Sequence, residues 1–393
     1  MGAVFALPFP VALFSITMAL AAIFWIASGD LRAKLHRALA SPVAWGVLAL
    51  LAWLALATVY STAPVDDVRA VSGKYAKLLY IPVLISIFHE SAWRERALIA
   101  FVASLGLVLG ISYAKFAGAL PEHWLAPGNV VAKTRILHSV LMAILIYVLT
   151  SWYLRYPHRR WWCAIGILAA LGNLLFLVDG RTGYAVLIAL VAVLLFTQWR
   201  WRGLAIAAAA CVALGTLAYV FAPVFQQRVD QSLQEFTDYR SHGAGATVAD
   251  STSVGLRLEH WANTWSLIQE RPLLGSGTGS WRQEYRARVA DPDAVLLLDA
   301  HNEYLMIWAQ AGMVGLFLYL VMLATQWRMS LRLTDDDRML AQGVVAMVLV
   351  VGLFNASLLY SHEGKVYVVM AGVAFAGLLK RSRGHTVSGE VSA

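Results

Sequence analysis

The chain has 393 residues, of which 60% are hydrophobic and only 14% are charged. Soluble domains are about half apolar and a quarter charged, so this composition excludes an ordinary soluble protein and predicts a polytopic membrane protein. The net charge of +8 comes from basic residues scattered among short loops, so we expect no nucleic-acid partner. Both cysteines, Cys163 and Cys211, fall in apolar stretches that imply no disulfide framework.

Apolar runs recur along the chain, and a membrane span needs roughly 20 such residues. They predict an all-α transmembrane bundle of 11–12 spans, the twelfth forming only if the first run, which Pro8 and Pro10 interrupt, folds back on itself. The first ten residues lack a basic segment, so we expect this run to stay as a span and not to be cleaved as a signal. The eleven runs are Val4–Ser28, Val43–Tyr60, Tyr75–Phe88, Ala97–Phe116, Ile136–Leu154, Trp162–Val178, Thr182–Gln198, Leu204–Phe221, Asn302–Thr325, Met339–Leu358 and Val366–Leu379.

The connecting loops alternate between two kinds. One set is rich in basic residues, and by the positive-inside rule it is cytoplasmic, as is the C-terminus, while the other set faces outward. We therefore divide the chain into an N-terminal transmembrane bundle (1–222), a long outer loop (223–301), C-terminal transmembrane helices (302–380) and a cytoplasmic tail (381–393). The basic set comprises Arg32, Lys34, Arg37, Arg94, Arg96, Arg155, Arg159, Arg160, Arg200, Arg202, Arg328, Arg332, Arg338, Lys380, Arg381 and Arg383.

The outer loop has the patterns of three helices. Apolar residues recur at helical spacing in Val224–Arg240 and in Arg257–Glu270, and a third, short helix is expected over Trp281–Ala290. A Gly/Ser/Thr-rich stretch separates the first two, and a glycine-rich turn, Gly275–Ser280, precedes the third. All seven basic residues of this loop are arginines, whose planar groups match phosphate oxygens in pairs.

His301 lies at the outer end of a predicted span between two carboxylates, Asp299 and Glu303. A carboxylate close to an imidazole raises its pKa and fixes its tautomer, which suits a general base or a phosphate partner. The alternative is that Asp299 caps the following helix and that His301 and Glu303 are interfacial polar residues.

Two arginines are candidates for binding an anion. Arg181 lies in so short a turn that it must sit at the membrane face, where an unpaired charge is costly. Its alternative is an ion pair with Asp179 together with snorkelling. Arg257 opens a predicted helix, where backbone N–H groups also favour anions, and its alternative is an ordinary solvated helix face.

Weaker candidates surround these residues. The turn with Gly277 and Gly279 could hold a phosphate through backbone N–H groups, although it lacks the context of a nucleotide motif and a plain turn is the alternative. Arg282 follows this turn; Lys74 and His362 lie at outward ends of spans, where snorkelling is the alternative for the lysine. The spacing of His, Cys, Asp and Glu matches no metal-binding motif, so we expect no metal and no cofactor.

The predicted topology brings Arg181, Arg257 and His301 to one face of the membrane, with Lys74 and His362 on the same side. Several cations around one histidine, at headgroup depth on the outer face, indicate a diphosphate attached to a lipid. Nucleotide-sugar donors are cytoplasmic, so an outward-facing transferase needs a lipid-borne donor.

The sequence resembles the O-antigen ligase and polymerase superfamily. The resemblance rests on "DGRTG" between two spans, the outer loop with its arginine helix and "RPLLGSGTGSW", and then "AHNEYLMIWAQAGMVGL", which together cover about Asp179 to Leu316. It implies an inverting, metal-independent glycosyltransferase of the inner membrane that takes glycan from undecaprenyl diphosphate on the periplasmic face. Arg181 and Arg257, with Lys74, would bind the diphosphate, and His301 would orient or deprotonate the acceptor hydroxyl.

The leading hypothesis is an O-antigen ligase, which transfers the glycan to a sugar hydroxyl of lipid A–core, and no obligate protein partner is inferred. The alternatives are an O-antigen polymerase, whose acceptor is a second lipid-linked glycan, a protein-glycosylating relative, and a membrane transporter. The family shows twelve spans with both termini inside, whereas eleven spans would place this N-terminus outside.

Overall fold

The computed structural model describes residues 1–178, 180–242, 253–288, 299–359 and 362–380, and throughout these ranges every regular element is a helix. The predicted all-α fold is confirmed. The helices are α1 (Gly2–Phe5), α2 (Val11–Ala27), α3 (Leu31–Leu39), α4 (Pro42–Leu56), α5 (Val65–Tyr75), η1 (Ala76–Leu79), α6 (Tyr80–Ile87), α7 (Ser91–Phe116), α8 (Arg135–Arg155), η2 (Pro157–Arg159), α9 (Arg160–Gly172), η3 (Asn173–Leu177), α10 (Arg181–Phe221), α11 (Pro223–His242), α12 (Ser253–Glu270), α13 (Trp281–Arg286), α14 (Glu303–Ser330), α15 (Asp335–Phe354), α16 (Glu363–Phe375) and η4 (Ala376–Lys380).

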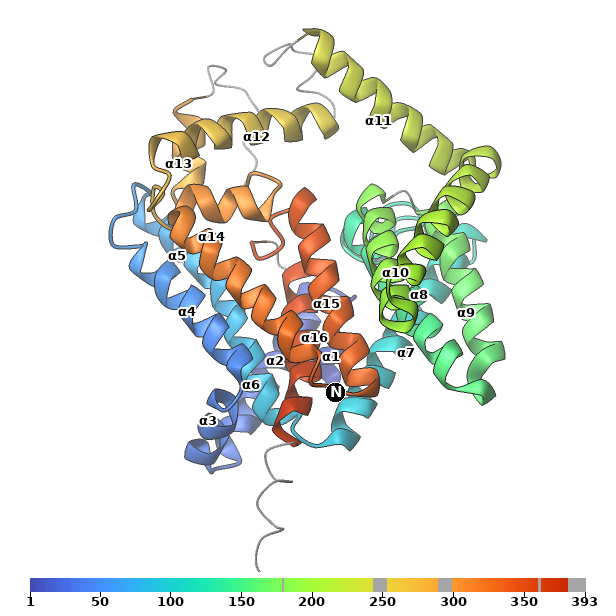
Figure 1. Cartoon of the computed structure of the whole chain (residues 1–393), viewed down its shortest axis with the longest axis horizontal. Helices are drawn as coiled ribbons and strands as arrows, with labels where there is room; N and C mark the ends of the chain where they lie inside the picture. The colour runs from blue at the N-terminus through green and yellow to red at the C-terminus, as the bar shows by residue number, and fades with distance from the viewer. Residues whose placement is uncertain (179, 243–252, 289–298, 360–361, 381–393) are drawn as a thin grey trace, which may run out of the picture.

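The helices form a bundle whose two ends differ, as Figure 1 shows. α11, α12 and α13 lie across one end, and α3 lies at the other. On one side α4 packs against α14 and α6 against α16, while on the other α8 packs against α9 and α10, and α15 joins the two sides through its contacts with α10 and α14. α8 is the most enclosed of the candidate spanning helices, since 78% of its most apolar segment is buried inside the protein.

In the part of the chain that the structure describes, seven helices are long and apolar enough to cross a membrane, or eight if α2 and α3, which meet at a bend of 117°, count as one span. Each of the eleven predicted apolar runs nevertheless falls mainly on helical residues. The number of candidate spans is lower than the eleven predicted for two reasons. α10 contains two of the predicted runs, divided by non-helical backbone at Arg200 (φ 51°, ψ −131°), and α4 and α16 have only 15 and 13 residues. The protein is a multi-pass membrane protein.

The N-terminal run is interrupted where its prolines predicted a break. α1 ends at Phe5 and α2 begins at Val11, after Pro10. α1 lies back against α2, since a Cβ on Gly2 would be 3.4 Å from Cγ2 of Thr17. A helix of four residues is about 6 Å long, so this fold-back does not supply a twelfth span.

The two kinds of predicted loop, basic and outward-facing, lie at opposite ends of the bundle. α14 begins at Glu303 near α12 and ends at Ser330 near the start of α7, and α10 runs from Arg181 to its break at Arg200 and then returns toward α11. The described basic loops therefore lie at the end away from α11–α13. Residues 381–393, the predicted cytoplasmic tail, and the Gly/Ser/Thr-rich stretch 243–252 lie outside the described residues.

Lys115, a charged residue near the end of the α7 span, has a structural role. It is 3% exposed, and its Nζ donates to the carbonyls of Trp124 (3.0 Å), Ala126 (2.6 Å) and Val130 (2.8 Å). The charge thus holds the loop between α7 and α8 in place by satisfying carbonyl groups that lack helical partners.

Candidate functional site

Four arginines from four different helices line one cavity of about 510 Å³ at the α11–α12 end of the bundle. We call it the arginine cavity. Arg135 is the first residue of α8 and Arg181 the first of α10, Arg228 lies on α11, and Arg257 lies in the second turn of α12. Thr182, Ser232, Trp261 and Phe354 are also among its lining residues.

The local backbone adds to the positive character of this cavity. α8 and α10 both begin at its edge, and the free N–H groups and dipole of a helix N-terminus favour an anion. The two helix starts approach closely because Gly180 and Gly183 leave room for Ser139: a Cβ on either glycine would lie 2.3–2.4 Å from Cβ of Ser139. The "GRTG" sequence is therefore required by packing as well as by charge.

Arg181 is paired within the protein. Its Nη1 donates to Oγ of Ser232 at 2.7 Å and lies 3.4 Å from Oε2 of Glu235, a carboxylate that is 6% exposed. The pairing expected with Asp179 falls on a residue outside the described chain. Glu235 also accepts the N–H of Val254 at 3.1 Å, so Arg181 is positioned by contacts that join α10, α11 and α12.

His301 lies immediately before α14 in a left-handed backbone conformation (φ 49°). Its N–H donates to Oδ1 of Asp299 at 2.7 Å, and its Nδ1 lies 3.6 Å from the same oxygen. Asp299 is 1% exposed and His301 17%, so a buried carboxylate orients an imidazole that retains access to a substrate.

Arg257 and His301 are electrostatically linked. Burial has the largest effect and lowers the pKa of His301 below the usual 6.5; the charge of Arg257 lowers it further, while Asp299 and a hydrogen bond with Asn355 partly offset the shift. The imidazole is therefore neutral at pH 7 and able to accept a proton.

The residue that caps α14 is Asn302, and the interpretation of Asp299 as the cap is wrong. The side chain of Asn302 accepts the N–H of Leu305 at 3.1 Å, while its amide donates to the carbonyl of Leu353 at 3.2 Å. Glu303 is fully buried and not interfacial: its Oε2 accepts the N–H of Leu358 at 2.6 Å, which joins the start of α14 to the chain after α15.

The glycine-rich turn is packed against protein backbone. Gly277 and Gly279 have φ values of 96° and 91°, and a Cβ on Gly277 would lie 2.1 Å from Cα of Ser61. The N–H groups of residues 275–280 all donate to protein acceptors, including the carbonyl of Gln310 and its Oε1. This geometry favours the plain-turn alternative, with the turn fastening the end of α4 to α14.

The remaining candidates lie apart from the arginine cavity. Lys74 is half-buried in the last turn of α5, and Arg282 is exposed on α13. His362 is 6% exposed before α16, where burial and the charges of Lys133, Lys365 and Lys77 lower its pKa to about 4. None of the three is among the described residues that line the cavity.

Sequence reasoning missed three residues at this site. Arg135 begins α8 in "KTRILH", and only the packing of α8 against α10 places it beside Arg181. Arg228 is one of the seven arginines of the outer loop, and nothing in the sequence distinguishes it from the others. His260 lies one turn after Arg257 on α12, is 1% exposed, and its ring centroid lies 6.1 Å from that of His301 and 4.8 Å from that of Tyr285. Its position one helical turn after Arg257 was the one feature of the sequence that could have identified it.

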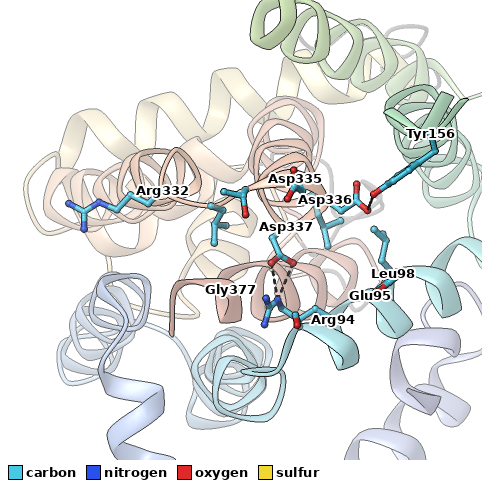
Figure 2. A pocket seen from close by; sticks show the side chains of 13 residues that line it. Arg94, Glu95, Leu98, Tyr156, Arg332, Asp335, Asp336, Asp337 and Gly377 are labelled. Atoms are coloured by element: carbon cyan, nitrogen blue, oxygen red, sulfur yellow. Dashed lines mark hydrogen bonds and ion pairs between the residues drawn. The ribbon is translucent and has the colours of Figure 1, made fainter. Parts of the chain in front are cut away.

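A larger cavity, of about 610 Å³, lies where α14 ends and α15 begins, and Figure 2 shows side chains that line it. Two of its carboxylates are paired: Nε of Arg94 lies 2.9 Å from Oδ2 of Asp337, and Asp336 accepts from Arg155 and Tyr156, each at 3.2 Å. These contacts fasten α7 and α8 to α15. The lining of this cavity therefore holds four carboxylates, Glu95 and Asp335–Asp337, against two arginines, Arg94 and Arg332, whereas four arginines line the arginine cavity.

Comparison with known proteins places the site in a family. Residues 166–320, from α9 to the middle of α14, match the family model described as O-antigen ligase, and this segment holds Arg181, Arg228, Arg257 and His301. Residues 166–320 are therefore similar to the O-antigen ligase family. The resemblance noted in the sequence is confirmed over this segment, and the family that it matches consists of membrane glycosyltransferase-like enzymes, ligases or polymerases.

The chain is also 21% identical over 274 residues to an uncharacterized protein of Haemophilus influenzae. The aligned region covers 66% of this chain and 66% of that protein, just under two thirds of the relative's length.

Proposed function

We propose that the protein is an O-antigen ligase that transfers glycan from undecaprenyl diphosphate to a sugar hydroxyl of lipid A–core. The observation that carries the proposal is the arginine cavity, whose Arg257 interacts electrostatically with His301; three of its four arginines and His301 lie in the matched family segment. The site would face the periplasm of a bacterial inner membrane, with the C-terminus in the cytoplasm, because the described basic loops lie at the other end of the bundle.

The donor's diphosphate fits the arginine cavity by charge. Arg181 and Arg257 bind its oxygens, and the cavity's other arginines, Arg135 and Arg228, add to the positive potential. As the bond from the sugar C1 to the diphosphate oxygen breaks, negative charge grows on that oxygen. Guanidinium groups fixed in advance, as Arg181 is by Ser232 and Glu235, stabilise this charge without reorganisation.

The acceptor hydroxyl is activated at His301. Its oxygen attacks C1 from the side opposite the diphosphate, which inverts the configuration, and its proton passes to the neutral imidazole. Asp299 holds the ring in position and stabilises the imidazolium that forms. No metal takes part in this mechanism.

The rival function is an O-antigen polymerase, which the same family match supports. Deletion of the gene, followed by analysis of lipopolysaccharide and lipid-linked glycan, separates the two. Loss of a ligase leaves lipid A–core bare while long lipid-linked glycan accumulates, and this is the result we expect. Core that carries a single repeat would instead establish the polymerase, and unchanged lipopolysaccharide would contradict both.

A further inference from the structure

A second cavity lies next to the arginine cavity. It is a half-open groove of about 410 Å³ between η3, the two halves of α10 and the first turn of α11. Its lining is apolar, and the one hydroxyl in it, that of Tyr184, donates to the carbonyl of Leu174 at 3.1 Å. We call it the apolar groove; Tyr184, Cys211, Gly215, Phe221 and Phe225 are among its residues.

The same two helices border both cavities. On α10, Arg181 lines the arginine cavity and Tyr184 the apolar groove; on α11, Arg228 lines the first and Phe225 the second. Each pair is three residues apart, which places the two side chains on one helix face about 4.5 Å apart along the axis. The rings of Tyr184 and Phe225 meet edge to face with centroids 5.0 Å apart. The groove thus begins one helical turn deeper in the bundle than the arginines.

A cationic cavity with an apolar groove one turn below it matches an amphiphile with an anionic head and a long hydrocarbon chain. We propose that the apolar groove holds the head-proximal part of the polyisoprenyl chain of the lipid-linked donor; this inference rests on the proposed function. Its volume is near the lower end of the roughly 300–1,000 Å³ range of small-molecule sites, which suits a stretch of one chain and not a whole diacyl lipid.

In this proposal the groove acts by orienting the lipid-linked donor. Lipid tails are as apolar as the groove, so a chain that leaves the bilayer for it gains packing and not hydrophobic transfer energy. A chain fixed one turn below Arg181 holds the diphosphate in register with the guanidinium groups. The expected effect of losing the groove is therefore a higher KM for long-chain donor with kcat retained.

Gly215→Leu tests this in the full-length protein in nanodiscs. Gly215 lines the groove, and no atom lies within 4 Å of an added Cβ, so leucine fits the helix and fills the groove. Gly106→Leu on α7 is the matched control, since its Cβ also meets open space, away from the groove.

With undecaprenyl diphosphate-linked glycan we expect the KM of Gly215→Leu to rise about tenfold over that of Gly106→Leu. With a donor on a two-isoprene chain the difference should shrink to less than about threefold. Equal KM values for the two variants with the long-chain donor would overturn the proposal.

The chain's own cysteines give a readout that needs no turnover. Cys211 lines the groove, while Cys163 is buried elsewhere and serves as an internal reference. Undecaprenyl diphosphate should slow labelling of Cys211 by N-ethylmaleimide, measured by peptide mass, whereas inorganic diphosphate and dioleoyl phosphatidic acid should not. Equal protection by phosphatidic acid, or no protection by undecaprenyl diphosphate, would overturn the assignment. Protection without any glycan transfer would instead count against the proposed function alone.

Discussion

Nη1 of Arg181 lies 3.4 Å from Oε2 of Glu235, and the same carboxylate oxygen accepts the N–H of Val254. Through this pair the first residue of a transmembrane helix, α10, is tied to α11 and to the start of α12, which carries Arg257. The position of one proposed diphosphate ligand therefore depends on the packing of the outer helices, and a guanidinium group held in this way is oriented before substrate binds.

Substituting Arg181 by lysine should impair transfer while the protein still folds. Lysine keeps the charge but loses the planar group that reaches Ser232, Glu235 and a phosphate together. We expect kcat/KM to fall by at least about tenfold, equivalent to about 1.4 kcal/mol, with Tm nearly unchanged. Wild-type kcat/KM in this variant would show that Arg181 only pairs with Glu235 and snorkels.

The pH dependence of transfer should report His301. A base must be neutral to accept a proton, and burial and Arg257 lower the pKa of His301 below 6.5, so kcat/KM should stay high at neutral pH and decline only below about pH 6.5. His301→Gln keeps a polar side chain of similar size but should lose the decline together with most of the activity. A variant that retains both would assign the proton to another group.

Arg135, which the sequence did not single out, should contribute to donor binding. Arg135→Gln removes one of the four cations at the cavity, and we expect the KM for lipid-diphosphate donor to rise about tenfold. Arg286→Gln is a matched control on the exposed face of α13, away from the cavity, and should leave KM unchanged. Equal KM values for the two variants would remove Arg135 from the donor site.

Gly277 should be required for stability. An alanine there must adopt a φ of 96° and place Cβ 2.1 Å from Cα of Ser61, so Gly277→Ala should destabilise the protein by at least about 2 kcal/mol, seen as a lower Tm in detergent. Gly73→Ala, at a helical glycine with open space around it, should keep or slightly raise Tm. A stable Gly277→Ala variant that has lost only donor binding would restore the phosphate-cradle interpretation.

Hydropathy located the apolar runs because a membrane-spanning helix must be apolar throughout, whereas α3 and most of α5 lie between those runs and were not predicted. The number of spans was harder to predict, since the break at Arg200 and the bend between α2 and α3 depend on tertiary packing. The sequence offered Asp299 as an alternative cap of α14, because a carboxylate before an apolar run is a usual N-cap. In the structure Asp299 accepts the N–H of His301, and Asn302 is the residue whose side chain accepts a free N–H of the helix.

The sequence also predicted part of the site. Arg181, Arg257 and His301 stand at predicted helix ends, and the topology brings such ends to one face. Arg135 joins them only because α8 and α10 pack through Ser139, Gly180 and Gly183, a close approach that no local pattern specifies. Lys74 and Arg282 share the predicted side of the membrane, but sharing a side does not bring residues into one cavity.

Reconstituted transfer tests the central claim most directly. Purified protein in nanodiscs is given undecaprenyl diphosphate-linked glycan and lipid A–core, and the glycosylated core is measured for wild type, His301→Ala and Arg257→Ala, each shown to be folded by its Tm. The proposed site predicts product with wild type and a loss of at least about a hundredfold in both variants. Product formed at wild-type rates by either variant, or no product from the folded wild-type protein, would contradict it.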